Sequence, residues 1–190
     1  MQQDLKSKAF NGVLWKGFER IGLNLLNLVL PIYLARILLP KDFGVISIML
    51  VFIDISNTLV NNGLCNAIIQ KKDSDEIDKS TVFWIQFFIA AFLYLILFFT
   101  SPLIADIYNS PEIESMLRVM SLSIVIGSFA AMQTTELNRT LQFKKSFIAN
   151  LLATIVYGSV GIVLGKLGFG AWSLVYANVL NKLTLCLTLS

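Results

Sequence analysis

The sequence predicts an all-α protein, a multi-pass transmembrane helix bundle. Of its 190 residues, 56% are hydrophobic and only 14% are charged. In a soluble domain about 45–50% of the residues are apolar and about 25% are charged. The apolar residues form continuous runs instead of alternating with polar ones, which favours membrane helices over a β-barrel. Because a helical crossing needs roughly 20 apolar residues, most of the chain can lie inside a membrane.

Six apolar runs define the expected helices. Pro102 is expected to end the third helix, and Pro111 is placed to begin the fourth. In the fifth, Gly158, Gly161 and Gly165 have the spacing of a close helix–helix contact. The predicted helices cover residues of about 12–35, 44–69, 80–105, 112–135, 147–165 and 171–190.

The first helix carries a polar stripe. Lys16, Arg20, Asn24, Asn27 and Pro31 follow one another at steps of four, four, three and four, so they share one helical face. The other faces consist mainly of Leu, Ile, Val and Phe. We therefore expect this helix to face lipid on one side and a polar cavity on the other.

A second stripe follows on the next helix. Asp54, Asn57 and Asn61 are spaced by three and four residues, and Asp54 lies near the middle of the apolar run. If the first two helices are neighbours, Asp54 lies level with Asn27, and Asn61 lies level with Arg20. These matching depths of the two stripes predict one shared polar cavity that is basic toward the cytosol.

Several functions are disfavoured by composition. The chain has no histidine, which removes His-dependent catalysis and His-ligated metal sites. Cys65 and Cys186 lie in separate apolar runs without metal-ligand or redox spacing. A net charge of +3 is too small to indicate a nucleic-acid partner. We expect a protein that is not an enzyme and has no cofactor, metal site or nucleic-acid partner.

The distribution of Lys and Arg predicts a cytosolic N-terminus. If six helices alternate sides, ten of these residues fall on one side and four on the other. The ten are Lys6, Lys8, Lys16, Arg20, Lys71, Lys72, Lys79, Arg139, Lys144 and Lys145. The four are Arg36, Lys41, Arg118 and Lys166. Lys182 lies within the last predicted helix, which Asn178 and Asn181 also interrupt, and belongs to neither group.

Four parts of the chain resemble a known family. They are residues 38–44 (LLPKDFG), 62–71 with the motifs NGL and AIIQK, 137–145 (LNRTLQFKK) and 168–175 (GFGAWSLV). Each motif is modest alone. In this order, and through essentially the whole chain, they are similar to those of bacterial polysaccharide exporters.

The resemblance implies a lipid-linked oligosaccharide flippase of the bacterial cytoplasmic membrane. Such proteins share a superfamily with multidrug and toxin extrusion transporters and with peptidoglycan-precursor flippases. They have two six-helix lobes around a central cavity and work by alternating access. Residues 1–190 would then form the N-terminal lobe, with the C-terminal lobe absent from this chain.

The substrate that the resemblance implies is undecaprenyl diphosphate carrying a sugar repeat unit. Membrane lipid, a polysaccharide polymerase and a chain-length regulator are the other expected partners. Lys16 and Arg20 are placed to meet the diphosphate. Asp54 and Glu19 are the candidates for binding a coupling proton or cation. The residues expected to bind sugar hydroxyls are Asn24, Asn27, Asn57 and Asn61.

Three alternatives stay open at this point. A cation-coupled multidrug exporter of the same fold would favour acids and aromatic residues in its cavity over an Arg and Lys entrance. A non-transporting scaffold of a polysaccharide assembly complex would tolerate removal of the cavity charges. A membrane-embedded glycosyl or acyl transferase is disfavoured because large polar catalytic loops and histidine are both missing.

Overall fold

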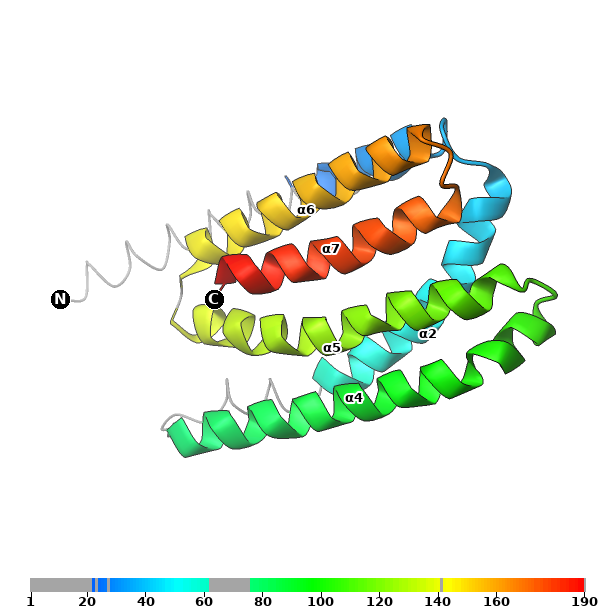
Figure 1. The fold of residues 1–190 in the computed structure, drawn as a ribbon. Helices are drawn as coiled ribbons and strands as arrows, with labels where there is room; N and C mark the ends of the chain where they lie inside the picture. The colour runs from blue at the N-terminus through cyan, green and yellow to red at the C-terminus, as the bar shows by residue number, and fades with distance from the viewer. Residues whose placement is uncertain (1–21, 23, 27, 62–75, 141, 190) are drawn as a thin grey trace.

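The protein is described by a computed structural model in which residues 22, 24–26, 28–61, 76–140 and 142–189 are placed. All regular structure in these residues is helical, which confirms the predicted all-α class. The helices are α2 (Pro40–Asn61), α4 (Glu76–Ile107), α5 (Glu112–Arg139), α6 (Phe143–Lys166) and α7 (Ala171–Leu189) (Figure 1). An N-terminal helical segment, Asn24–Leu34, precedes them.

Four of the described helices are long and apolar enough to cross a membrane, which agrees with a multi-pass protein. Their membrane-spanning parts are Pro40–Val60, Ser80–Ile107, Glu112–Leu137 and Lys144–Lys166. Many of their large apolar side chains are exposed, including Phe99 on α4 at 74%. In a membrane protein such side chains face lipid, so their exposure carries no solvation penalty.

Two antiparallel helix pairs lie side by side. α4 packs against α5, α6 packs against α7, and α5 and α7 join the pairs (Figure 1). α2 passes behind α5 in the view of Figure 1 and contacts α4, α5 and α7. The core lies where these helices meet and includes Met49, Leu117 and Val175, each fully buried. Gln86 of α4 donates a buried hydrogen bond of 3.4 Å to the carbonyl of Val60, which ties α4 to the last turn of α2.

The helices extend beyond several predicted ends. α4 begins at Glu76 instead of residue 80, α5 ends at Arg139 instead of 135, and α6 begins at Phe143 instead of 147. The predicted bounds followed the apolar runs, but backbone hydrogen bonding continues through polar residues beyond them. The part of the predicted second helix after Asn61 lies outside the described residues.

α2 begins at Pro40 and not at Gly44, because the first turn is capped. The Asp42 Oδ2 atom accepts a hydrogen bond of 3.0 Å from the Leu39 backbone N–H, as the third helical residue does in a capping box. Pro40 occupies the first helical position, where its missing N–H costs nothing. The connection between the N-terminal helical segment and α2 therefore consists of residues 35–39.

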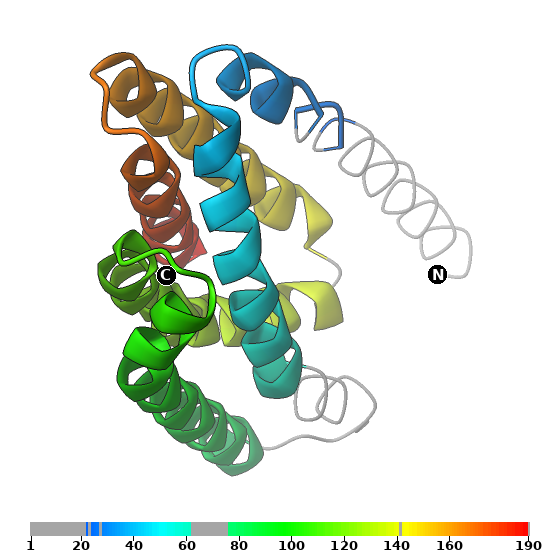
Figure 2. The same cartoon turned by 90° about the vertical axis from the view of Figure 1, so that its right-hand side faces the viewer.

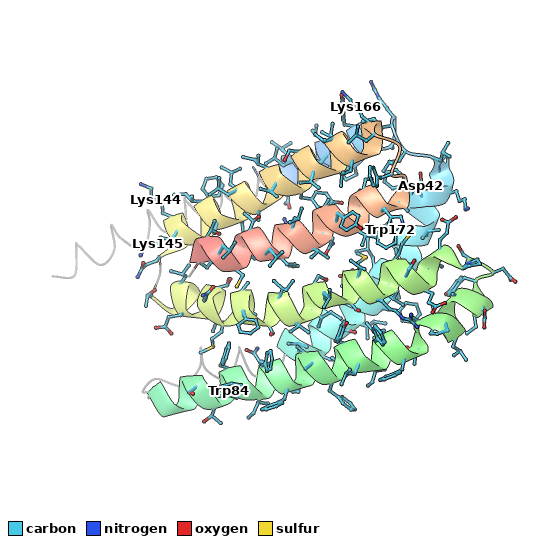
Figure 3. The ribbon with its side chains drawn as sticks, viewed as in Figure 1. Asp42, Trp84, Lys144, Lys145, Lys166 and Trp172 are labelled. Carbon is cyan, nitrogen blue, oxygen red and sulfur yellow. The ribbon has the colours of Figure 1, made fainter. Side chains whose placement is uncertain are left out.

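The same aspartate contacts the turn between α6 and α7. Gly170 has φ = +53°, and a Cβ built on it would lie 3.1 Å from Asp42 Oδ1. Two of the segments that carry the family resemblance therefore meet at one end of the bundle. Figure 3 shows Asp42 and Lys166 at this end and Lys144 and Lys145 at the opposite end.

α4 continues through Pro102 to Ile107, so the prediction that Pro102 ends this helix is wrong. Proline removes the donor for the Phe98 carbonyl four residues earlier. Here that carbonyl accepts other bonds, from Ser101 Oγ at 2.8 Å and from Arg118 Nε at 3.4 Å. Membrane helices tolerate proline when neighbouring groups satisfy the freed carbonyl in this way.

The predicted glycine contact on α6 is confirmed. A Cβ at Gly158 would lie 2.6 Å from Leu30 Cδ2, and one at Gly161 would lie 3.4 Å from Leu34 Cδ2. Gly165 similarly faces the side chains of Ile37 and Leu38. The absence of a side chain at Gly158 lets the N-terminal helical segment approach α6 closely.

Replacing Gly158 with valine is expected to lower the free energy of unfolding by about 1–3 kcal/mol, the usual cost of overpacking. The added methyl groups would occupy the space of the Leu30 side chain. Thermal unfolding of the purified protein measures the loss. Gly44→Ala is the matched control, because nothing lies within 4 Å of a Cβ there. Equal melting temperatures for the two variants would contradict the close contact.

Candidate functional site

The polar face of α7 is the most unusual feature inside the bundle. Asn178, Asn181 and Lys182 are spaced by three and one residues, so they lie on one face over a single turn. α6 presents Thr154 and Tyr157 toward them. These five side chains line a partly open cavity of about 200 Å³.

Lys182 lies among four helices. Its stem passes α5 at Gly127, where a Cβ would lie 3.9 Å from Lys182 Cδ. The carboxylate of Asp54, on α2, acts electrostatically on the Lys182 ammonium. The aliphatic stem therefore packs beside α5, and Asp54 offsets part of the cost of placing a cation within the bundle.

Two polar groups of the cavity lack partners. Within the described part of the chain, the Lys182 ammonium makes no hydrogen bond and has no carboxylate within 4 Å. The Asn178 Oδ1 atom is buried without a hydrogen-bond partner among these residues. Groups buried without partners are costly, and they become favourable when a ligand supplies the missing bonds.

The cavity suits a ligand that is both hydroxylated and anionic. The ammonium of Lys182 supplies a positive charge and three donors. The amides of Asn178 and Asn181 offer both donors and acceptors, and Tyr157 offers a ring and a hydroxyl. A phosphate, a carboxylate or sugar hydroxyls fit this set of groups, whereas an apolar ligand would leave them unpaired.

None of the predicted site residues whose side chains the structure describes lines the cavity. Asp54 is exposed on α2 and is the carboxylate that acts on Lys182. Asn57 is half-buried one turn further along α2 and does not line the cavity. Asn24 is exposed on the N-terminal helical segment and does not line it either.

The other predicted site residues are not tested by the structure. Asn61 is the last residue of α2, but its side chain lies outside the described part. The described part of the N-terminal helical segment packs on α6 and diverges from α2 (Figure 2). The remaining four, which all lie outside the described residues, are Lys16, Glu19, Arg20 and Asn27.

The sequence pattern of α7 itself indicates a polar site. Asn178, Asn181 and Lys182 share one face of an otherwise apolar helix, the same pattern that singled out the first two helices. In the sequence they only interrupt an apolar run. The residues that face them, Thr154 and Tyr157, lie on another helix, so the sequence does not show the five together. Only the packing of α6 against α7 shows that the five side chains form one cavity.

The fold and this cavity define a multi-pass membrane protein with a polar cavity among its helices. Comparison with known proteins then places the chain more narrowly. Residues 33–190 match the polysaccharide biosynthesis protein family, and the chain belongs to that family. No solved structure matches it.

Three curated relatives illustrate the family. The lipopolysaccharide biosynthesis protein WzxC of Escherichia coli (strain K12) is 28% identical over 74% of this chain and 29% of its own length. The succinoglycan biosynthesis transport protein ExoT of Rhizobium meliloti (strain 1021) is 28% identical over 84% of this chain and 32% of its own length. The teichuronic acid biosynthesis protein TuaB of Bacillus subtilis (strain 168) is 26% identical over 45% of this chain and 18% of its own length. The chain spans about a third of the length of the first two relatives.

Proposed function

We propose that this protein is a flippase that moves undecaprenyl-diphosphate-linked oligosaccharide repeat units across the bacterial cytoplasmic membrane. The observation that carries the proposal is the ammonium of Lys182 beside two amides, one of which has a buried oxygen without a hydrogen-bond partner among the described residues, in a cavity between helices of a membrane bundle. The family and the names of its relatives, which include a transport protein, support a role in polysaccharide export. Residues 1–190 would form the N-terminal lobe of a transporter with two lobes.

The mechanism follows from the different solvation of the two ends of the substrate. The prenyl tail can remain in lipid, whereas the diphosphate and sugars need polar partners while they cross. Lys182 and the two amides of α7 would receive the anionic and hydroxyl groups within the membrane. Lys16 and Arg20 would meet the diphosphate first, near the cytosol. Rocking between lobes would then open the cavity outward. Translocation breaks no covalent bond, so no catalytic residue is needed.

Asp54 is the described residue best placed to couple transport to an ion. It is a carboxylate within a membrane-spanning helix, and its charge acts on Lys182. Binding of a proton or cation at Asp54 would change the field at the substrate site. A cation-coupled multidrug exporter could use the same carboxylate, and this is the second function that the site supports.

Complementation tests the proposal. The protein as its gene encodes it is expressed in a bacterium that lacks its own repeat-unit exporter, and surface polysaccharide and lipid-linked precursor are measured. Restored surface polysaccharide is the expected result. Accumulated precursor, despite confirmed membrane insertion and a matching repeat unit, would contradict the flippase and favour the drug exporter.

We also predict that the Lys144 end of the bundle faces the cytosol. Single cysteines replace Lys144 and Lys166 in a background without Cys65 and Cys186. A membrane-impermeant maleimide added to intact cells should label position 166 and leave position 144 unlabelled until the membrane is broken. Both lysines are exposed at opposite ends of α6, so access is not limiting. The reverse labelling would contradict the proposed orientation.

A further inference from the structure

α4 contains a proline that does not end it. Pro102 lies within α4, and the helix continues to Ile107. Because proline has no N–H, the carbonyl of Phe98 loses its helical donor. Inside a membrane an unsatisfied carbonyl is costly, so the helix can continue only if other donors replace the missing one.

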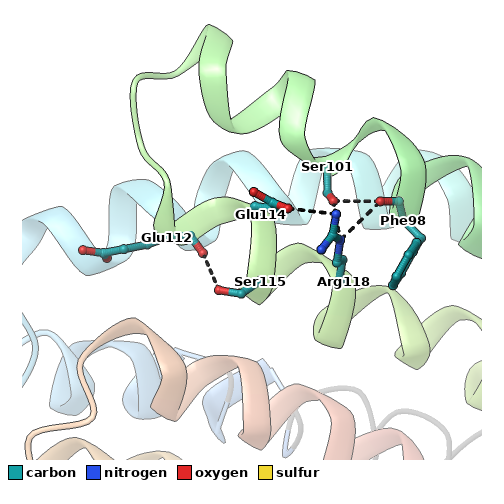
Figure 4. A network of polar contacts seen from close by, with 6 residues as sticks. All are labelled: Phe98, Ser101, Glu112, Glu114, Ser115 and Arg118. Atoms are coloured by element: carbon teal, nitrogen blue, oxygen red, sulfur yellow. Dashed lines mark hydrogen bonds and ion pairs between the residues drawn. The ribbon is translucent and has the colours of Figure 1, made fainter.

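Those donors come partly from another helix (Figure 4). Ser101 Oγ donates to the Phe98 carbonyl at 2.8 Å. Arg118, on α5, places Nε 3.4 Å from the same carbonyl and 3.0 Å from Ser101 Oγ. Its guanidinium carbon also lies 4.6 Å from the centroid of the Phe98 ring. A side chain of α5 therefore takes the place of a backbone donor of α4.

A carboxylate on α5 holds this guanidinium in position. Arg118 Nη2 lies 2.8 Å from Glu114 Oε1, one turn earlier on the same helix. The two side chains are only 34% and 39% exposed, and Ser101 is fully buried. Partial burial reduces screening by solvent, and the planar guanidinium can serve the carboxylate and the α4 groups together.

We propose that Pro102 is a hinge in α4 and that Arg118 is the brace that locks it. The segment beyond the hinge, Leu103 to Ile107, lacks one of the backbone bonds that hold it to the rest of α4. The bonds from Arg118 tie the hinge to α5 instead. Releasing them leaves fewer bonds across Pro102 than an uninterrupted helix has, which lowers the cost of bending α4 there. The inference does not depend on the proposed function.

A double-mutant cycle tests the brace. Hydrogen–deuterium exchange is measured at the amides of residues 103–107 in the purified, lipid-reconstituted protein. Arg118→Met is expected to speed exchange about tenfold or more, as loss of a charge-assisted bond implies. In a Pro102→Ala background the new backbone N–H at position 102 replaces the brace, so Arg118→Met should change exchange by about twofold or less. Equal effects in both backgrounds would overturn the proposal.

Two further variants separate the brace from a simple effect of charge at this end of the bundle. Arg118→Lys keeps the charge near Glu114 but lacks the planar fork, so it should not restore protection. Full protection by lysine would overturn the brace. Lys41→Met, which removes an exposed pair with Glu112 at the same end, should leave exchange unchanged. If Arg118→Met alone fails to accumulate, the Pro102→Ala double variant should accumulate, and its failure would also overturn the proposal.

Discussion

Replacing Lys182 with glutamine is expected to abolish most export without reducing the amount of protein in the membrane. Glutamine keeps a polar side chain of similar length but removes the positive charge that faces the cavity. A charge-assisted hydrogen bond contributes about 1.5–3 kcal/mol, so substrate affinity should fall about 10- to 150-fold. Surface polysaccharide and lipid-linked precursor in the complementation assay measure the effect.

Lys166→Gln is the matched control for this variant. It makes the same chemical change at the exposed end of α6, away from the cavity, and should leave export unchanged. The Lys182 variant should be as stable as the parent, because removing a partly buried charge without a close partner seldom destabilises a fold. Normal export by the Lys182 variant would exclude this cavity as the substrate site.

Replacing Gly170 with alanine is expected to be the most destabilising small substitution in the described part of the chain. Its φ of +53° is unfavourable for any residue with a Cβ, at about 1–2 kcal/mol. The added Cβ would also lie 3.1 Å from Asp42 Oδ1, the aspartate that caps α2. Disturbing that cap should cost about a further 0.5–2 kcal/mol. Thermal unfolding and cellular abundance measure the sum.

Gly168→Ala separates the two contributions. Gly168 also has a positive φ, +84°, but nothing lies within 4 Å of its Cβ position. The Gly168→Ala variant should therefore lose only the stability that the backbone conformation contributes, and it should remain clearly more stable than the Gly170→Ala variant. Similar losses in the two variants would mean that the contact with Asp42 contributes nothing to the fold.

The helices were predictable from the sequence because the apolar runs are long. The glycine spacing of α6 correctly indicated a close contact, since small residues at that spacing have few other uses in membranes. The end of α4 was not predictable. Whether a helix passes through Pro102 depends on donors that replace its missing N–H, and one of them, Arg118, is supplied by the next helix in the chain.

The candidate site was predictable only in part. Asp54 stood out because a carboxylate in the middle of an apolar helix is expensive, and the structure relates it to Lys182. Lys182 itself was visible as an interruption of the last helix, but its neighbours come from α2, α5 and α6. Which polar stripes face one another is decided by helix packing, and a single sequence does not contain that information.

The most direct test of the central claim is movement of the substrate itself between membrane leaflets. The protein as its gene encodes it is reconstituted in vesicles with a fluorescent polyprenyl-diphosphate-linked oligosaccharide, and a lectin added outside reports the sugars in the outer leaflet. We expect the accessible fraction to change when the parent protein is present and to change far less with Lys182→Gln. An unchanged fraction with the folded parent protein, together with transport of a cationic dye by the same vesicles, would contradict the flippase and support a drug exporter.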